Sequence, residues 1–295
     1  MLDIHTHLFW DSYDSDRDVV IRRARVAGVR QMISVGTSPE DNAQAVAVAE
    51  QYEGIYASVG LHPHFFNKII EKEFPISNVQ NFISELKKLA EHKKVVAIGE
   101  CGLDYFVRGE EEPITDEQKI RQKEGCTAQF ALAQELGLPI IIHTRPSVGN
   151  DDAYEDMYEI LQYLARQRRA SIPYPASQFI LHCYQGDTEV TKKFLALPDV
   201  YFSFSGSITY PVKQSLVGTK DDSAAVVKLI PLDRLFIETD CPFLAPQTKR
   251  GARNEPAYVS FVAEAICRLK ECSVSDLDQY LAENWERVFG ANTRR

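Results

Sequence analysis

The feature that most limits the folds open to this chain is a regular alternation of short β-forming runs with longer, helix-patterned stretches. Segments between the runs, such as 41–51, 116–136, 154–166 and 221–230, are amphipathic and long enough to cross back over a sheet. Strands joined by such crossovers pair in parallel, so we expect a parallel α/β sheet. Eight runs are predicted strands: 2–5, 31–35, 55–59, 95–99, 139–143, 179–182, 200–204 and 235–238.

Eight strand–helix units predict a closed (β/α)8 barrel, the TIM-barrel class of α/β fold. The rival architecture is an open doubly wound sheet, which requires a switch in strand order that a sequence does not reveal. Two further helices are expected at 256–270 and 273–289, the second beginning at the capping residue Ser273. Because the chain contains no linker, low-complexity tract or internal repeat, we expect residues 1–295 to form a single domain.

Composition restricts the cellular setting and the class of partner. Hydrophobic residues make up 44% of the chain and charged residues 25%, a balance typical of soluble globular proteins. Neither a signal peptide nor an apolar run of roughly 20 residues is apparent, so we expect a cytoplasmic protein with no membrane partner and no obligate protein partner. Six cysteines without a C-x-x-C pair are expected to be free thiols. The net charge of −9 argues against a protein that coats long stretches of duplex, so nucleic acid would have to be bound locally.

Histidines concentrate at the ends of the predicted strands. Residues at the C-terminal ends of barrel strands converge on one mouth, so positions far apart in sequence can surround one small volume. His5 and His7 are two apart on an extended segment, so both rings point to the same face and can bind one ion. Six of the seven histidines, with Glu100 and Asp240, lie at or within a few residues of such ends: His5, His7, His62, His64, His143 and His182.

Imidazole and carboxylate side chains together are typical ligands of zinc, manganese, iron or nickel, whereas magnesium is less expected with so much nitrogen. The alternative is that these residues are structural and occupy separate hydrogen-bonded niches, as a lone strand-end histidine usually does. The coincidence of all these positions favours a shared metal site.

Seven motifs occur in order over nearly the whole chain: DIHTHL (3–8), GLHPH (60–64), IGECGLDY (98–105), IHTR (142–145), LHC (181–183), ETDCPFLAP (238–246) and RNEP (253–256). Together they resemble the motifs of the TatD-type deoxyribonucleases of the amidohydrolase superfamily. The third and sixth motifs are highly specific. The resemblance implies a closed barrel and exonuclease-like cleavage of DNA. It further implies that Glu100 bridges two divalent ions, one held by His5, His7 and Asp240 and the other by His143 and His182.

Other residues near the predicted mouth are given roles in catalysis. Asp240 is expected to act as the general base in addition to binding metal, and Glu100 to support catalysis through the metal. His62 and His64 are expected to contact phosphate or protonate the leaving group, the alternative being two loop histidines without a role. Asp104 could orient a metal-bound imidazole or, equally, stabilise a loop as an Asx turn.

Basic residues near strand ends are candidate contacts to substrate. Arg145 could make charge-assisted bonds to a phosphate, or form a plain salt bridge. Lys249, Arg250 and Arg253 form a basic cluster that could hold DNA, although charge runs are more often solvated faces. Aromatic residues on the loops after strands are expected mostly to pack in the core, but unstacked bases could lie on some of them: Phe9, Trp10, Phe65, Phe66 and Tyr105.

Three departures from the family pattern concern the mouth rather than the metal ligands. Phe9 and Trp10 follow the H-x-H-L motif where family members usually carry an acidic residue, segment 146–152 is longer than usual, and Tyr184-Gln185-Gly186 replaces a common Phe-Ser-Gly. Substrate contacts are therefore less well defined by the resemblance than the metal site.

The sequence predicts an enzyme, a divalent-metal-dependent hydrolase with two ions (zinc, manganese or magnesium) that degrades single-stranded DNA or strand ends. One alternative keeps the ions but hydrolyses another ester or amide, as an aminoacyl-tRNA deacylase would. Another is a metal-binding interaction platform without catalysis. A bridging carboxylate argues against this last reading, because a structural metal site does not need one.

Overall fold

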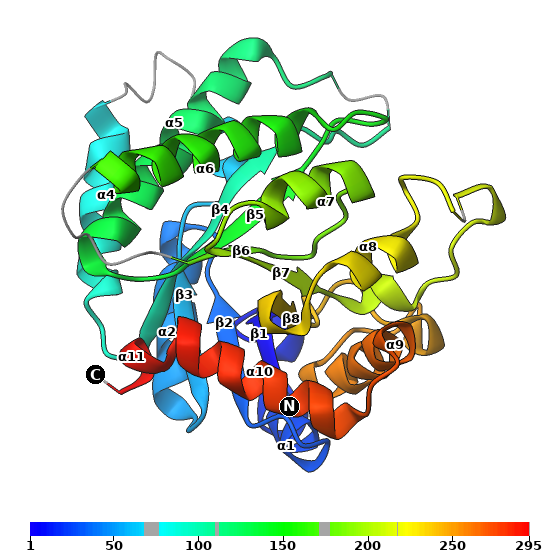
Figure 1. Ribbon diagram of the computed structural model, residues 1–295. Helices are drawn as coiled ribbons and strands as arrows, with labels where there is room; N and C mark the ends of the chain where they lie inside the picture. The colour runs from blue at the N-terminus through cyan, green and yellow to red at the C-terminus, as the bar shows by residue number, and fades with distance from the viewer. Residues whose placement is uncertain (68–76, 110–111, 171–177, 217, 295) are drawn as a thin grey trace.

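Eight parallel strands pair in the order in which they occur along the chain. The computed structural model describes residues 1–67, 77–109, 112–170, 178–216 and 218–294. The strands lie at the centre of Figure 1 with helices around them. Their bounds are β1 Leu2–Thr6, β2 Gln31–Val35, β3 Ile55–Val59, β4 Val95–Asp104, β5 Ile140–Arg145, β6 Phe179–Leu181, β7 Val200–Phe204 and β8 Leu235–Ile237.

The first and last strands meet, so the sheet closes into a barrel. Beyond β8, the amide of Asp240 donates to the carbonyl of His5 at 2.9 Å, and the amide of His7 donates to the carbonyl of Cys241 at 2.8 Å. Thr6 and Cys241 form a parallel bridge. The predicted barrel is confirmed, and the open doubly wound sheet is excluded because strand order never reverses.

All eight predicted strands are present, and β4 differs most from its prediction. It extends to Asp104, five residues beyond the predicted end at residue 99. Gly102 has φ +145° and pairs with His143 of β5, whose backbone would collide with any Cβ at this position. Glycine therefore lets β4 continue in close contact with β5, and this brings Glu100 next to His143.

Helices cover the outside of the strands (Figure 1). The capping patterns explain several boundaries: Ser38 caps α2, Thr115 and Gln118 form a capping box at α5, and Ser273 and Asp276 form another at α10. The helix expected at 256–270 begins with a 3-10 turn, Pro256–Tyr258, before α9. The helices are α1 Arg17–Val26, α2 Pro39–Gln51, α3 Pro63–Asn67, α4 Ser77–Ala90, α5 Asp116–Leu136, α6 Asp152–Ala170, α7 Thr188–Leu195, α8 Ser223–Leu229, α9 Val259–Lys270, α10 Val274–Val288 and α11 Gly290–Thr293.

Beneath the mouth, a buried polar contact joins β1 to the segment after β8. Asp3 is fully buried and accepts hydrogen bonds from the Thr239 hydroxyl at 2.6 Å and the Thr239 amide at 3.0 Å. Burial raises the pKa of the Asp3 carboxyl to about 8, although the Thr239 hydrogen bonds act in the opposite direction. This contact fixes the first strand against the last.

All six cysteines are free thiols, as expected. None of the helices among the described residues has the length and apolar character needed to span a membrane.

Candidate metal centre

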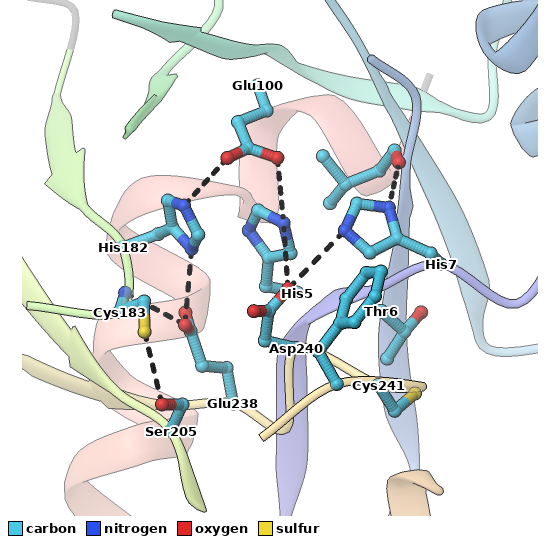
Figure 2. Close-up of polar contacts among 12 residues, drawn as sticks. His5, Thr6, His7, Glu100, His182, Cys183, Ser205, Glu238, Asp240 and Cys241 are labelled. Carbon is cyan, nitrogen blue, oxygen red and sulfur yellow. Dashed lines mark hydrogen bonds and ion pairs between the residues drawn. The ribbon is translucent and has the colours of Figure 1, made fainter. Parts of the chain in front are cut away.

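Several of the predicted strand-end residues come together at the mouth of the barrel, and Figure 2 shows His5, His7, Glu100, His182 and Asp240. His5 lies in β1 and His7 directly follows it, with ring centroids 5.0 Å apart. Glu100 comes from β4, whose extension carries it to the same place. Asp240 follows β8 and has φ +56°, a left-handed conformation held by its backbone bond to the carbonyl of His5. Such backbone strain in a non-glycine residue is found mainly at functional sites.

One oxygen of Glu100 faces the histidines of the first strand. Its Oε2 lies 3.3 Å from Nε2 of His5. Asp240 Oδ1 lies 3.4 Å from Nε2 of His7 and 3.8 Å from Nε2 of His5. Four side chains from three strand ends thus direct donor atoms at one small volume.

The other oxygen of Glu100 faces a second pair of imidazoles. Oε1 lies 2.7 Å from Nδ1 of His143 and 2.8 Å from Nε2 of His182. His62 is near the same oxygen, with its Nε2 3.7 Å away. Because its two oxygens face different groups of donors, the Glu100 carboxylate stands between them.

The donor set fits divalent cations. Both ring nitrogens of His5 are buried and form no hydrogen bond with the described residues, Nε2 having only its 3.3 Å approach to Glu100, and the His5 ring stacks on His182 at 3.9 Å. Two imidazoles held face to face beside buried carboxylates would be stabilised by a cation placed between the nitrogen and oxygen atoms. The candidate ligands therefore meet the requirement of a metal site better than that of a hydrogen-bonded network.

The electrostatics of the pocket point in the same direction. Burial alone would raise the pKa of the Glu100 carboxyl, but His182, His5 and the hydrogen bond from His143 hold it well below its usual range. For His143, burial alone would lower the pKa of the imidazole. The hydrogen bonds to Asp104 and Glu100 outweigh this effect and raise the pKa to about 9. The carboxylates thus favour any positive charge placed among them, whether a proton or a metal ion.

The chain's relatives agree with this chemistry. A family model described as TatD related DNase matches residues 2–290. The chain belongs to the TatD family. It is 38% identical to the uncharacterized metal-dependent hydrolase YabD of Bacillus subtilis, over 99% of this chain and 100% of that protein.

Two further TatD relatives extend the comparison. A protein of Cronobacter sakazakii named 3'-5' ssDNA/RNA exonuclease TatD is 30% identical over 99% of this chain and 98% of its own length. The crystal structure of the TatD homolog YJJV from Escherichia coli superposes with a TM-score of 0.77 at 27% identity, covering 98% of each chain. The chain is therefore a metal-dependent hydrolase with the TatD barrel.

In this TatD protein, outer hydrogen bonds orient the candidate ligands. Asp104 is buried, and its Oδ2 lies 3.1 Å from Nε2 of His143 and 3.1 Å from Nε2 of His64. It therefore contacts two imidazoles rather than serving only as a loop turn, although it also accepts from the Phe106 amide at 3.0 Å. His7 is oriented similarly, since its Nδ1 donates to the carbonyl of Val35 at 2.8 Å.

Sequence reasoning missed Glu238. This residue is fully buried, and its Oε1 lies 3.2 Å from Nδ1 of His182 and accepts from the Cys183 amide at 2.8 Å. The sequence did contain a signal, because Glu238 lies two residues before Asp240 at the end of a predicted buried strand. A carboxylate that is buried there requires a hydrogen-bond or charge partner.

The predicted pair His62 and His64 lies at the mouth. The His62 ring is 4.6 Å from that of His143 and 4.8 Å from that of His64. Burial lowers the pKa of His62 to about 3, so this imidazole is neutral at physiological pH. His64 is the more exposed of the two and reaches Asp104 instead of Glu100.

The four predicted basic contacts each lie over an aromatic ring. Arg145 is exposed, with its guanidinium 3.6 Å from the Phe106 ring centroid. Lys249 lies 5.3 Å from the ring of Tyr258, and Arg250 lies 4.9 Å from that of Tyr210.

Arg253 is not brought into the metal cluster. Its Nη2 bonds to Oδ2 of Asp16 at 2.6 Å, its Nη1 bonds to the carbonyl of Ser12, and its guanidinium covers the Tyr13 ring at 4.4 Å. These contacts occupy the guanidinium within the chain, which weakens the predicted role of Arg253 in binding substrate.

The RNEP motif joins the segment after β8 to the loop after β1. The side-chain amide of buried Asn254 donates to the carbonyls of Thr239 at 2.9 Å and Phe243 at 2.6 Å, and the Asn254 backbone carbonyl accepts from the Tyr13 hydroxyl at 2.5 Å. Glu255 accepts hydrogen bonds from Arg23, the shortest at 2.5 Å. The motif therefore positions the loops of the mouth.

Replacing Asn254 with alanine is expected to lower the free energy of unfolding by about 2 kcal/mol, because two carbonyls lose their hydrogen-bond donor. Thermal denaturation followed by circular dichroism measures the change. The matched control is Asn150→Ala, at an exposed position, which should leave the midpoint nearly unchanged. Equal midpoints for the two variants would refute the structural role.

Proposed function

We propose that the chain is a two-metal phosphodiesterase that removes nucleotides from the ends of single-stranded DNA. The observation that carries the proposal is that Oε1 and Oε2 of Glu100 face two separate groups of imidazoles. A carboxylate in this position can bridge two cations, which a purely structural metal site does not need.

The chain offers ligands for both ions. His5, His7, Glu100 and Asp240 would hold one of them. Glu100, His143 and His182 would hold the other. Zinc or manganese suits these nitrogen-rich donors better than magnesium. When bound, the ions supply Lewis acidity at a phosphoryl oxygen and lower the pKa of a bound water.

Protein groups would move the protons of the reaction. Asp240 presents Oδ1 at the mouth and is the proposed acceptor of the proton from the attacking water. Neutral His62 and the more exposed His64 are proposed to contact the phosphate, with His64 placed to protonate the departing oxygen. Arg145 and the pair Lys249 and Arg250 would hold the flanking phosphates.

The choice of nucleic acid is supported by the Cronobacter sakazakii relative, which is named for ssDNA/RNA exonuclease activity. We also propose that the protein is a soluble enzyme of the cytoplasm. The whole chain of 295 residues is proposed to form one domain, because all eight strands pair in a single sheet.

An activity panel tests the proposed function. The protein, reconstituted with zinc, manganese or magnesium, is incubated with end-labelled single-stranded DNA, RNA, aminoacyl-tRNA and simple esters. We expect a ladder of shortened DNA that chelator abolishes. Turnover of esters or aminoacyl-tRNA without loss of DNA would replace this function with a different hydrolase activity, and no turnover would leave a metal-binding protein without catalysis.

Replacing Glu238 with glutamine is expected to weaken metal affinity by about 10- to 100-fold, because the hydrogen bond that orients His182 loses its charge. Competition with a chelating indicator measures the affinity of each ion. Glu189→Gln on the exposed surface of α7 serves as the matched control. Unchanged affinity in Glu238→Gln would contradict the proposed orientation of His182.

A further inference from the structure

The structure separates the aromatic residues of the mouth into two kinds. Phe9, Phe66 and Tyr105 are at most 4% exposed and belong to the core, and the partly buried Phe65 packs against the small cluster formed by Leu61 and Phe66. Trp10 is only half-buried, and Phe243, which sequence reasoning did not single out as a surface for bases, is 43% exposed. Two accessible aromatic rings thus remain on the loops that follow the first and last strands.

These two rings flank a candidate metal ligand. Trp10 and Phe243 meet edge to face, with centroids 4.9 Å apart and ring planes at 88°. The His7 ring lies 5.9 Å from that of Trp10 and 6.1 Å from that of Phe243. The aromatic pair therefore forms part of the rim directly beside the candidate centre.

The loop that carries Trp10 is fixed by hydrogen bonds. Nε of Arg17 donates to the carbonyl of Leu8 at 2.7 Å, and its Nη2 donates to that of Phe9 at 3.2 Å. The Trp10 carbonyl accepts from the amide of Tyr13 at 3.0 Å. A loop held at this many points presents its side chain in one orientation before any ligand arrives.

The two aromatic loops are also tied to each other. The Tyr13 hydroxyl donates to the carbonyl of Asn254, whose side chain donates to the carbonyl of Phe243. Hydrogen bonds beneath the two rings therefore support the spacing between Trp10 and Phe243. A recognition site needs this kind of support beneath the groups that touch the ligand.

We propose that Trp10 and Phe243 form a stacking platform for a nucleobase, which positions the end of a nucleic acid strand beside the candidate metal centre. The inference rests on the proposed function. Every base has an apolar face that can stack on an aromatic ring, so the platform binds without reading sequence. Stacking also allows a protein with a net negative charge to bind DNA through a base, without depending on phosphate contacts.

Fluorescence can observe the platform directly, because the chain contains only two tryptophans, Trp10 and Trp285. Trp285 is 3% exposed, and its Nε1 forms no hydrogen bond with any residue that the structure describes, so Trp285→Phe removes none of the described bonds and leaves Trp10 as the only tryptophan. We expect octathymidylate with phosphorothioate linkages to quench this signal. The same phosphorothioate backbone without bases should not.

Kinetics give a second readout. Trp10→Ala and Phe243→Ala should each raise KM for single-stranded DNA about tenfold through loss of stacking, with kcat changed less than about threefold. Trp10→Phe should retain most of the affinity. The control is Tyr163→Ala, which removes an aromatic side chain that is 61% exposed on α6. Thermal denaturation of each variant shows whether it is folded. If Trp10→Ala is not folded, fluorescence quenching of Phe243→Ala in the Trp285→Phe background measures binding instead.

The outcomes distinguish the platform from the function on which it rests. DNA cleavage with unchanged KM in both aromatic variants, or equal quenching by the oligonucleotides with and without bases, would overturn the platform and leave the nuclease intact. Absence of any nucleic acid cleavage by the unaltered protein would overturn the proposed function itself.

Discussion

Hydrolysis by the Glu100→Gln variant is expected to fall by about 10³-fold or more. Glutamine keeps the size of glutamate but replaces one of the two oxygens by an amide nitrogen, which cannot bind a cation. One carboxylate oxygen lies 3.3 Å from His5 and the other lies 2.7 Å from His143. In either orientation of the amide, its nitrogen therefore replaces an oxygen that would bind one of the two cations. Turnover of single-stranded DNA and metal content by mass spectrometry measure the loss.

The control for this substitution is Glu91→Gln, which makes the same chemical change at an exposed position. It should leave both turnover and metal content at the level of the unaltered protein. If Glu100→Gln retained more than about a tenth of the activity, the carboxylate would not be the bridge that the proposed centre requires.

The second large effect is expected for Asp240→Asn, with kcat lowered about 10²- to 10⁴-fold through loss of the proposed proton acceptor. Asparagine tolerates the left-handed backbone, here φ +56°, as well as aspartate does. The amide nitrogen of residue 240 still donates to the carbonyl of His5, so the fold should be retained. Steady-state kinetics and thermal denaturation of the same preparation provide the measurement.

Asp221→Asn, on the exposed surface before α8, is the matched control and should have full activity. A fall in the melting temperature of Asp240→Asn that accompanies the loss of activity would mean that Asp240 acts on the fold, and would remove the support for a role in proton transfer.

The strands and most helices could be predicted because their signals are local. Apart from β4, every predicted strand ends within two residues of the observed end, and capping residues such as Ser273 begin helices within one position of the expected start. The extension of β4 could not be predicted in the same way. It depends on the contact of Gly102 with the backbone of His143, which exists only once β4 and β5 are paired.

The convergence of the strand-end histidines could also be predicted, since closure of the barrel brings such positions together. The partners around them could not. Glu238 resembles any residue at the end of a strand until its contact with His182 is seen. Arg253 resembles a free cation until the structure pairs it with Asp16, 237 positions away along the chain. Long-range pairs of this kind leave no periodic trace in a sequence.

The buried contact between Asp3 and Thr239 has a consequence for the order in which the protein is assembled. Ribosomal synthesis releases the N-terminal strand first, but its closing partner emerges only when most of the polypeptide has left the exit tunnel. Until then the first strand has one open edge, and the amino-terminal histidines lack Asp240, one of the two acidic residues that face them. A polypeptide that ended before position 239 would lack both the contact that closes the barrel and Asp240. Such a truncated chain could not form the complete candidate metal centre.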